Sequence, residues 1–163
     1  MSESLENFTN IVKEDIKEAK TLFFSEAFKE EYLKDRREEK ELYHQLLLGR
    51  NRNQILEEFL LSSGQKKPVL LSAAKTIYQA TIMNLDEPLE IKVKREGWGY
   101  LVGRIKSDGT FLSIHKNTFQ AEDFEDGTLT IYADMKTIPK DGDIDHLTIQ
   151  TVYQTLQIEV VYK

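Results

Sequence analysis

Apolar and polar side chains alternate with a period of two through the C-terminal part of the chain, and this pattern constrains the fold more than any other feature. The clearest run is LEIKVK at residues 89–94, and shorter runs follow at 129–131, 147–149 and 156–160. Successive side chains of a β-strand point to opposite faces of its sheet, so these runs predict half-buried antiparallel strands. They indicate an all-β sandwich, which leaves little room for an active site.

Turn residues cut this part of the chain into short segments. Clusters of glycine, proline, aspartate and serine stand at 86–88, 97–99, 107–109, 125–127 and 139–143. The segments between them recur at intervals of about ten residues, which is the spacing of strands in a sandwich. We therefore expect seven or eight short strands.

The first 65 residues have a helical period instead. One apolar stripe with spacings of three and four predicts a first helix of about five turns, and it consists of Leu5, Phe8, Val12, Ile16, Ala19 and Phe23. A second helix is expected from an N-cap at Ser25 to Gly49, and a short third helix from Asn51 or Asn53 to Gly64. The N-terminal segment therefore contains two to three helices.

A charged run interrupts the apolar pattern of the second helix. The segment Lys34–Glu41 is KDRREEKE, in which every residue is charged. Such a run cannot be buried, and pairs four residues apart, such as Arg37 and Glu41, support a solvated helix. A docking surface for another protein is the alternative interpretation of this run.

The change of period marks a domain boundary. No proline occurs before Pro68, and the period of two begins after it. We expect an α+β protein with a helical segment at 1–65 and a β-sandwich domain at 68–163.

Composition narrows the classes of partner. The chain has 163 residues, a net charge of −6 and no cysteine. Its basic residues are interleaved with acidic ones, which argues against binding of nucleic acid or of an anionic membrane. The absence of cysteine excludes disulfides and cysteine nucleophiles. The polar start Met1-Ser2-Glu3-Ser4 is unlike a signal peptide, so we expect a soluble protein without membrane insertion and favour a cytoplasmic location.

Residues 88–162 resemble a known family in the order of their strands and turns. The alternating strand at 89–94 leads into Gly97-Trp98-Gly99-Tyr100-Leu101, and a Lys140-Asp141-Gly142-Asp143 turn precedes the last two strands. This order resembles the immunoglobulin-like sandwiches of the MSP and ASPM–SPD-2–Hydin type, above all their bacterial relatives in large proteins. Those families have an asparagine-x-glycine turn between the second and third strands, and the segment 94–97 lacks the asparagine.

The resemblance implies an immunoglobulin-like fold for the sandwich and a role in protein–protein interaction or scaffolding without catalysis. It covers less than half of the chain, and the helical segment resembles no family. The partner implied is another protein or a neighbouring domain of the same polypeptide; in the second case this chain is a fragment of a larger protein.

No set of residues in the sequence has the arrangement typical of a catalytic or metal-binding site. The histidines His44, His115 and His146 lack the spacing of a helical zinc site. Asp141, Asp143 and Asp145 have a spacing of two, but they do not fit a calcium loop and are interpreted as a turn. Glycines 97, 99 and 103 do not fit a phosphate loop, because residues 100–102 continue as strand where that motif opens a helix, and we interpret the glycines as turn or bulge positions. We expect no enzyme, metal or cofactor.

Three aromatic residues at loop positions are the candidate binding residues. Trp98 stands between two glycines, Tyr100 follows it, and Tyr153 lies in the last hairpin turn. Exposed aromatic rings anchor protein interfaces or stack on sugars. The alternative for Trp98 is that it folds back and covers the end of the sandwich core. The favoured function is a noncatalytic interaction module that meets its partner through an exposed strand edge or an aromatic loop tip. The alternatives are a carbohydrate-binding accessory domain and an enzyme with its site where helices and sandwich meet.

Overall fold

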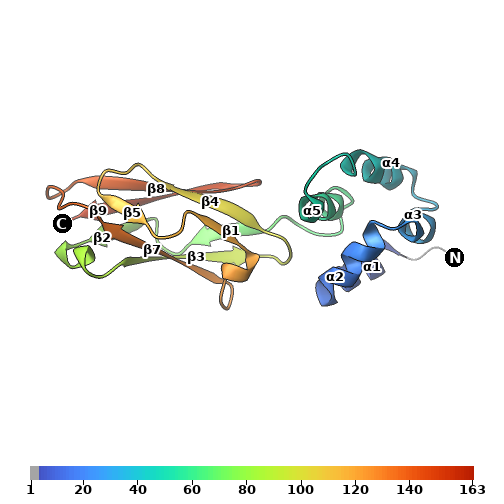
Figure 1. Ribbon diagram of the computed structural model, residues 1–163, viewed down its shortest axis with the longest axis horizontal. Helices are drawn as coiled ribbons and strands as arrows, with labels where there is room; N and C mark the ends of the chain where they lie inside the picture. Colours follow the sequence, from blue (N-terminus) through green and yellow to red (C-terminus); the bar gives the residue numbers. More distant parts are fainter. Residues whose placement is uncertain (1–3) are drawn as a thin grey trace. The chain divides into compact units, whose positions relative to one another are not determined.

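The computed structural model describes residues 4–163, which divide into two compact units (Figure 1). The helical unit consists of the described residues up to Pro68 together with the tripeptide Trp98–Tyr100. The sandwich unit consists of Val69–Gly97 and Leu101–Lys163. Most of the polar start that argued against a signal peptide, residues 1–3, lies outside the described part of the chain.

Within the described residues the helical unit has five α-helices, so the prediction of two to three was too low. Each is short, and three begin at a side chain that accepts a backbone N–H, namely Ser4, Asp15 and Asn51. The helices are α1 (Leu5–Glu14), α2 (Ile16–Phe23), α3 (Glu26–Tyr32), α4 (Arg37–Leu46) and α5 (Arg52–Ser62).

The predicted first helix is broken in two at Asp15. This residue is extended, with φ −147° and ψ 91°, and its carboxylate accepts the N–H of Glu18 at 3.1 Å. Asp15 therefore ends α1 and caps α2. The apolar stripe hid the break because Val12 and Ile16 keep a spacing of four across it, although Ile16 is exposed.

The predicted second helix is also two helices. α3 begins after Ser25, as expected, but it ends at Tyr32, and α4 starts only at Arg37. The first part of the charged run therefore lies in the connection and not in a helix. The expected pair in the second part is present, because Arg37 Nε lies 3.6 Å from Glu41 Oε1 in an exposed position.

Aromatic rings form the core of the helical unit. Phe8 and Phe28 lie 4.7 Å apart between ring centroids, and Phe23 lies 4.9 Å from Tyr43 and 5.3 Å from Phe59. All five rings are almost fully buried. Tilted and edge-to-face pairs of this kind stabilise a small core beyond the area they bury.

The sandwich unit has nine strands and two short 3-10 helices in the described residues, against an expected seven or eight strands. The two shortest strands have three residues each, too few to show a period in the sequence. The elements are β1 (Leu70–Ala73), β2 (Ile77–Ala80), η1 (Ile82–Leu85), β3 (Leu89–Glu96), β4 (Val102–Ser107), β5 (Leu112–Ile114), β6 (Thr118–Gln120), η2 (Ala121–Asp123), β7 (Thr128–Met135), β8 (Ile144–Thr151) and β9 (Thr155–Tyr162).

The strands form two sheets with immunoglobulin-like topology. One sheet has the order β1-β3-β7-β5, and the other has the order β2-β9-β8-β4-β6. In an immunoglobulin domain the first, second, fifth and fourth strands share one sheet and the third, sixth and seventh share the other. β1, β3, β7 and β5 match the first set, and β4, β8 and β9 match the second. β2, which is parallel to β9, and β6 are additions at the two edges of the second sheet.

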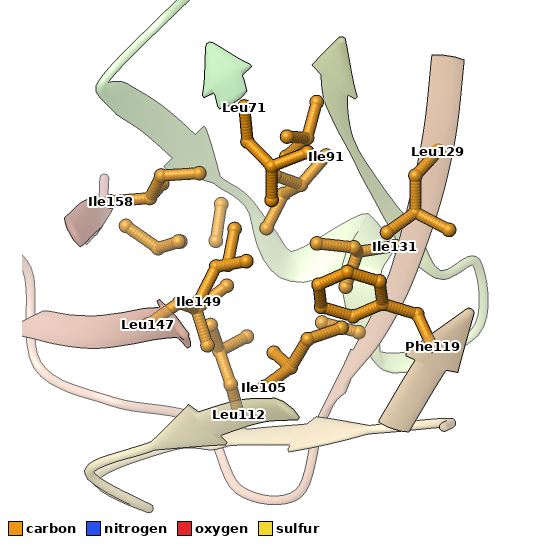
Figure 2. Close-up of a cluster of buried hydrophobic side chains, with 14 of the residues drawn as sticks. Leu71, Ile91, Ile105, Leu112, Phe119, Leu129, Ile131, Leu147, Ile149 and Ile158 are labelled. Carbon is orange, nitrogen blue, oxygen red and sulfur yellow. The ribbon is translucent and has the colours of Figure 1, made fainter. Parts of the chain in front are cut away.

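The sandwich core lies between the two sheets, where the alternating runs predicted it (Figure 2). Ile91 and Val93 are fully buried, whereas Lys92 and Lys94, which alternate with them, are exposed. Ile91 stands opposite Ile131 on β7, and Leu147 stands opposite Ile158 on β9. The alternating pattern therefore predicted correctly where these strands lie and which of their faces is buried.

Across residues 4–163, no helix combines the length and apolar character that crossing a membrane requires.

Candidate functional site

Trp98 packs within the helical unit and does not project as a free ring. It packs against the aromatic core as a half-buried residue. The ammonium of Lys66 lies 4.4 Å from the centre of its ring, and that of Lys13 lies 5.1 Å away. These cation–π contacts already occupy the ring, which does not favour a sugar platform.

A buried ion pair holds the backbone of the same tripeptide. Lys66 Nζ lies 2.6 Å from Glu57 Oε1, and both side chains are at most 3% exposed. Lys66 also donates to the carbonyl oxygen of Trp98 at 2.5 Å. Gly99 has φ +100°, and a side chain there would meet Lys66 Nζ at 2.7 Å. The positive φ therefore favours glycine at this position.

The other two candidate aromatic residues are half-buried and belong to different units. Tyr100 lies in the helical unit, where its hydroxyl accepts from Asn51 Nδ2 at 3.3 Å. Tyr153 lies in the sandwich unit, in the β8–β9 turn, where its N–H donates to Thr151 Oγ1 at 3.2 Å. The three rings thus belong to two units, and a binding role for them stays a prediction.

The edges of the two sheets are the places where the sandwich offers unpaired backbone groups. Such edges pair with other chains unless something blocks them. The outer edges belong to β1 and β5 in one sheet and to β2 and β6 in the other. The four edges differ in whether a side chain forms hydrogen bonds with their outward-facing N–H and C=O groups.

A glutamine amide occupies the edge of β1. Leu71 stands opposite Arg95, whose N–H is bonded on the β7 side, so the backbone groups of Leu71 point away from β3. Gln154 Oε1 accepts the N–H of Leu71 at 2.7 Å, and its Nε2 donates to the carbonyl of Leu71 at 2.7 Å. The side chain of Gln154 therefore takes the place of a neighbouring strand.

A buried carboxylate occupies the edge of β5. Asp145 Oδ2 on β8 accepts the N–H groups of Phe111 at 3.0 Å and Leu112 at 2.9 Å. Asp145 is fully buried, so this contact links the two sheets. Its position corrects the interpretation of Asp141, Asp143 and Asp145 as one turn, because Asp145 lies within a strand.

Asp123 occupies the edge of β6. Phe119 stands opposite Gly103 in the ladder, so the neighbouring Gln120 directs its N–H outward. Asp123 Oδ2 accepts this N–H at 2.8 Å. The backbone hydrogen bond, together with the ion pair to Lys116, lowers the pKa of Asp123 from its ordinary value. The carboxylate therefore stays ionised and keeps the edge blocked.

The edge of β2 has no such block. Glu159 donates to the carbonyl of Thr76, and Lys163 donates to that of Ala80, so the residues between them that face outward are Ile77 and Gln79. In the described part of the chain, no side chain donates to or accepts from the backbone groups of these two residues.

The open edge belongs to an uncharged segment with several exposed apolar side chains. Residues 76–85 contain no charged side chain, and four of the exposed large apolar residues lie among them: Ile77 (60%), Ile82 (50%), Met83 (61%) and Leu85 (37%). The uncharged segment was visible in the sequence, but its position on an edge required the strand order. Sequence analysis therefore suggested a strand edge as a binding mode but did not locate it on this segment.

The histidines and glycines have structural explanations. His115 pairs with Asp134 at 2.5 Å and His146 pairs with Asp108 at 3.0 Å, both at the surface, while His44 is exposed on α4. Within residues 4–163, no group of three histidine or acidic side chains is placed to hold a metal ion. Gly103 lies inside β4, where the ring of Phe119 fills the place of its side chain, so the turn or bulge interpretation was wrong for this glycine.

A family model describes nearly the whole chain. The family is described as a family of unknown function (DUF5717), N-terminal, and the match covers residues 2–163. This chain belongs to that family. No curated protein matches the chain.

Solved structures resemble the sandwich at low identity. The Escherichia coli chaperone DraB has a TM-score of 0.45 and 8% identity, over 58% of this chain and 55% of that one. The chaperone YadV has a TM-score of 0.41 and 12% identity, over 58% and 51%. The PapD-like domain 7 of human CEP192 has a TM-score of 0.36 and 10% identity, over 60% and 88%.

This chain spans about half the length of the two chaperone structures, 55% and 51% respectively. At these identities the likeness concerns the fold alone. The sandwich is immunoglobulin-like, as expected, whereas its assignment to the MSP or ASPM–SPD-2–Hydin type and its bacterial origin stay predictions.

Proposed function

We propose that this chain is a noncatalytic protein-interaction module that binds an extended segment of its partner as an additional strand on β2. The partner is another protein or a neighbouring domain of the same polypeptide. In this mode of recognition, main-chain hydrogen bonds supply affinity and alternate side chains supply specificity.

The contrast among the four edges carries the proposal. Gln154, Asp145 and Asp123 each occupy an outward backbone group at β1, β5 and β6. The backbone groups of Ile77 and Gln79 on β2 have no such side chain. Natural sandwiches block their edges against pairing, so an edge left open beside exposed apolar side chains is suited to a partner strand.

Site-specific photocrosslinking tests the proposal. A photoreactive amino acid replaces Gln79 on the open edge or, as a control, Ser72 on β1, which is also exposed and lies next to the blocked Leu71, and the chain is irradiated in its native cells. We expect defined crosslinked products from position 79 and none from position 72. Equal products from both positions, or none from position 79, would contradict strand addition at β2.

A charged substitution checks that the products depend on the edge. Lysine on an edge strand opposes pairing, because the added strand would bury its charge. Ile77→Lys should therefore abolish the products from position 79. Ile138→Lys changes an equally exposed loop residue (63% against 60%) and should leave them unchanged.

A further inference from the structure

A second surface of the sandwich has a charge opposite to that of the chain as a whole. A groove of about 710 Å³ lies beside β4, β6 and β8. Its lining includes Arg104 from β4, Lys116 before β6, Asp123 from η2 and Gln150 from β8. This groove lies within the sandwich unit and shares no residue with the outward positions of β2.

The positive charge of the groove is only partly neutralised. Among the described residues that line it, Asp123 is the single acidic one, and it pairs with Lys116 at 3.1 Å. Arg104 is exposed, and no carboxylate of residues 4–163 pairs with it. A guanidinium without a partner in a chain of net charge −6 favours an anionic ligand.

The rest of the lining favours a peptide over a nucleic acid. Val102 and Val152 are 37% and 65% exposed, and they offer apolar contact along the groove. Phe119 is the one aromatic residue among the described lining, and it is only 4% exposed, so no ring is available for stacking on a base. Guanidinium groups bind carboxylates with two parallel hydrogen bonds.

We propose that this groove binds an acidic, extended peptide segment, with a carboxylate of the peptide paired to Arg104 and its apolar side chains against Val102 and Val152. The inference concerns a surface other than the β2 edge, although it shares with the proposed function the premise that the chain binds proteins. It specifies the chemical class of a second partner segment, namely an acidic peptide.

Fluorescence anisotropy with defined peptides tests the inference on the whole chain. The probe is a labelled hexapeptide of alternating glutamate and valine, and a lysine–valine hexapeptide serves as the counterpart. We expect saturable binding of the acidic peptide only. Arg104→Gln should weaken it about tenfold, the loss typical of one charge-assisted hydrogen-bonded pair.

Two further variants distinguish binding of the peptide in the groove from attraction of the peptide to the general charge of the surface. Lys106→Gln removes a cation from the same outward face of β4, two residues from Arg104 and outside the groove, and should leave binding unchanged. Gln150→Glu adds a negative charge inside the groove and should weaken binding as Arg104→Gln does.

Three outcomes overturn the inference. They are the absence of saturable binding to the acidic peptide, equal losses in the Arg104 and Lys106 variants, and tighter binding of a short oligothymidylate than of the acidic peptide. Any of them leaves strand addition at β2 intact, because the crosslinks at position 79 do not involve the groove.

Discussion

Tyr43 shows how one residue makes the helical unit sensitive to alkaline pH. Its hydroxyl donates to the carbonyl of Phe23 in the aromatic core. Burial, and secondarily the charge of Glu26, raises the pKa of Tyr43 from its ordinary value of 10.0. The folded state therefore holds the phenol proton more tightly than the unfolded state. The stability that this contributes is complete below pH 10 and is lost as the pH rises through the folded pKa.

We predict that Tyr43→Phe lowers the unfolding free energy at pH 8 by about 1 kcal/mol, because one buried hydrogen bond is lost. The same variant should lose less stability than the wild type between pH 8 and pH 11. Urea unfolding followed by circular dichroism at 222 nm measures both. Tyr132→Phe, at an exposed position on β7, should show the wild-type pH dependence.

In the sandwich, the stability effect of a single residue can be tested at Asp145, which accepts hydrogen bonds from two backbone N–H groups that no strand pairs. We predict that Asp145→Ala costs about 3 kcal/mol, because the N–H groups of Phe111 and Leu112 would remain buried without acceptors. Asp143→Ala removes one exposed turn contact to Lys140 and should cost less than about 1 kcal/mol. Similar costs for the two variants, measured by urea unfolding, would refute the inter-sheet role of Asp145.

At the scale of elements, the strands with a long alternating pattern were predictable and the short ones were not. β3 is eight residues long and has an apolar side chain at every second position from Leu89 to Val93, so its inward face could be predicted. β5 and β6 are defined by their partners β7 and β4, and three residues cannot show a period. The break at Asp15 was hidden because the apolar stripes of α1 and α2 are in phase.

The open edge of β2 could not be derived from local sequence for a similar reason. An edge can be located only once the order of strands is known, and the side chains that block the β1 and β5 edges come from distant positions in the sequence. Gln154 and Leu71 are 83 positions apart. The sequence therefore suggested a strand edge as one binding mode without identifying the strand, and the only binding residues that it named were aromatic loop residues.

Gly103 and Phe119 couple two neighbouring strands. A Cβ at Gly103 would lie 2.2 Å from the ring of Phe119 and 2.7 Å from the carbonyl oxygen of Gln150. We predict that Gly103→Ala destabilises the sandwich by about 1–3 kcal/mol, the usual cost of overpacking. In a Phe119→Leu background the cost should be smaller, because the ring is gone, and a double-mutant cycle by urea unfolding measures this coupling. Additive costs would contradict the packing of the ring against Gly103.

At the scale of the whole molecule, the described residues form two hydrophobic clusters that share no member. The helical unit is not continuous in sequence, because it includes the tripeptide that follows β3 in the chain. Two interpretations of Trp98 are therefore compared: a stabilising residue of the helical unit and a binding residue. If it stabilises the helical unit, its contacts with the aromatic core and with Lys66 account for it. If it is a binding residue, stability should not depend on it.

Trp98→Ala separates these roles. We predict a loss of about 2 kcal/mol from the helical unit, less than for a fully buried tryptophan because the ring is half-buried. In amide hydrogen exchange, peptides from α1 and α5 should lose protection, whereas those from β3, β7 and β8 should keep it. Tyr153→Ala, in the sandwich, should leave the helical peptides unchanged. Unaltered protection of α1 and α5 in the Trp98 variant would instead favour a contact residue for a partner.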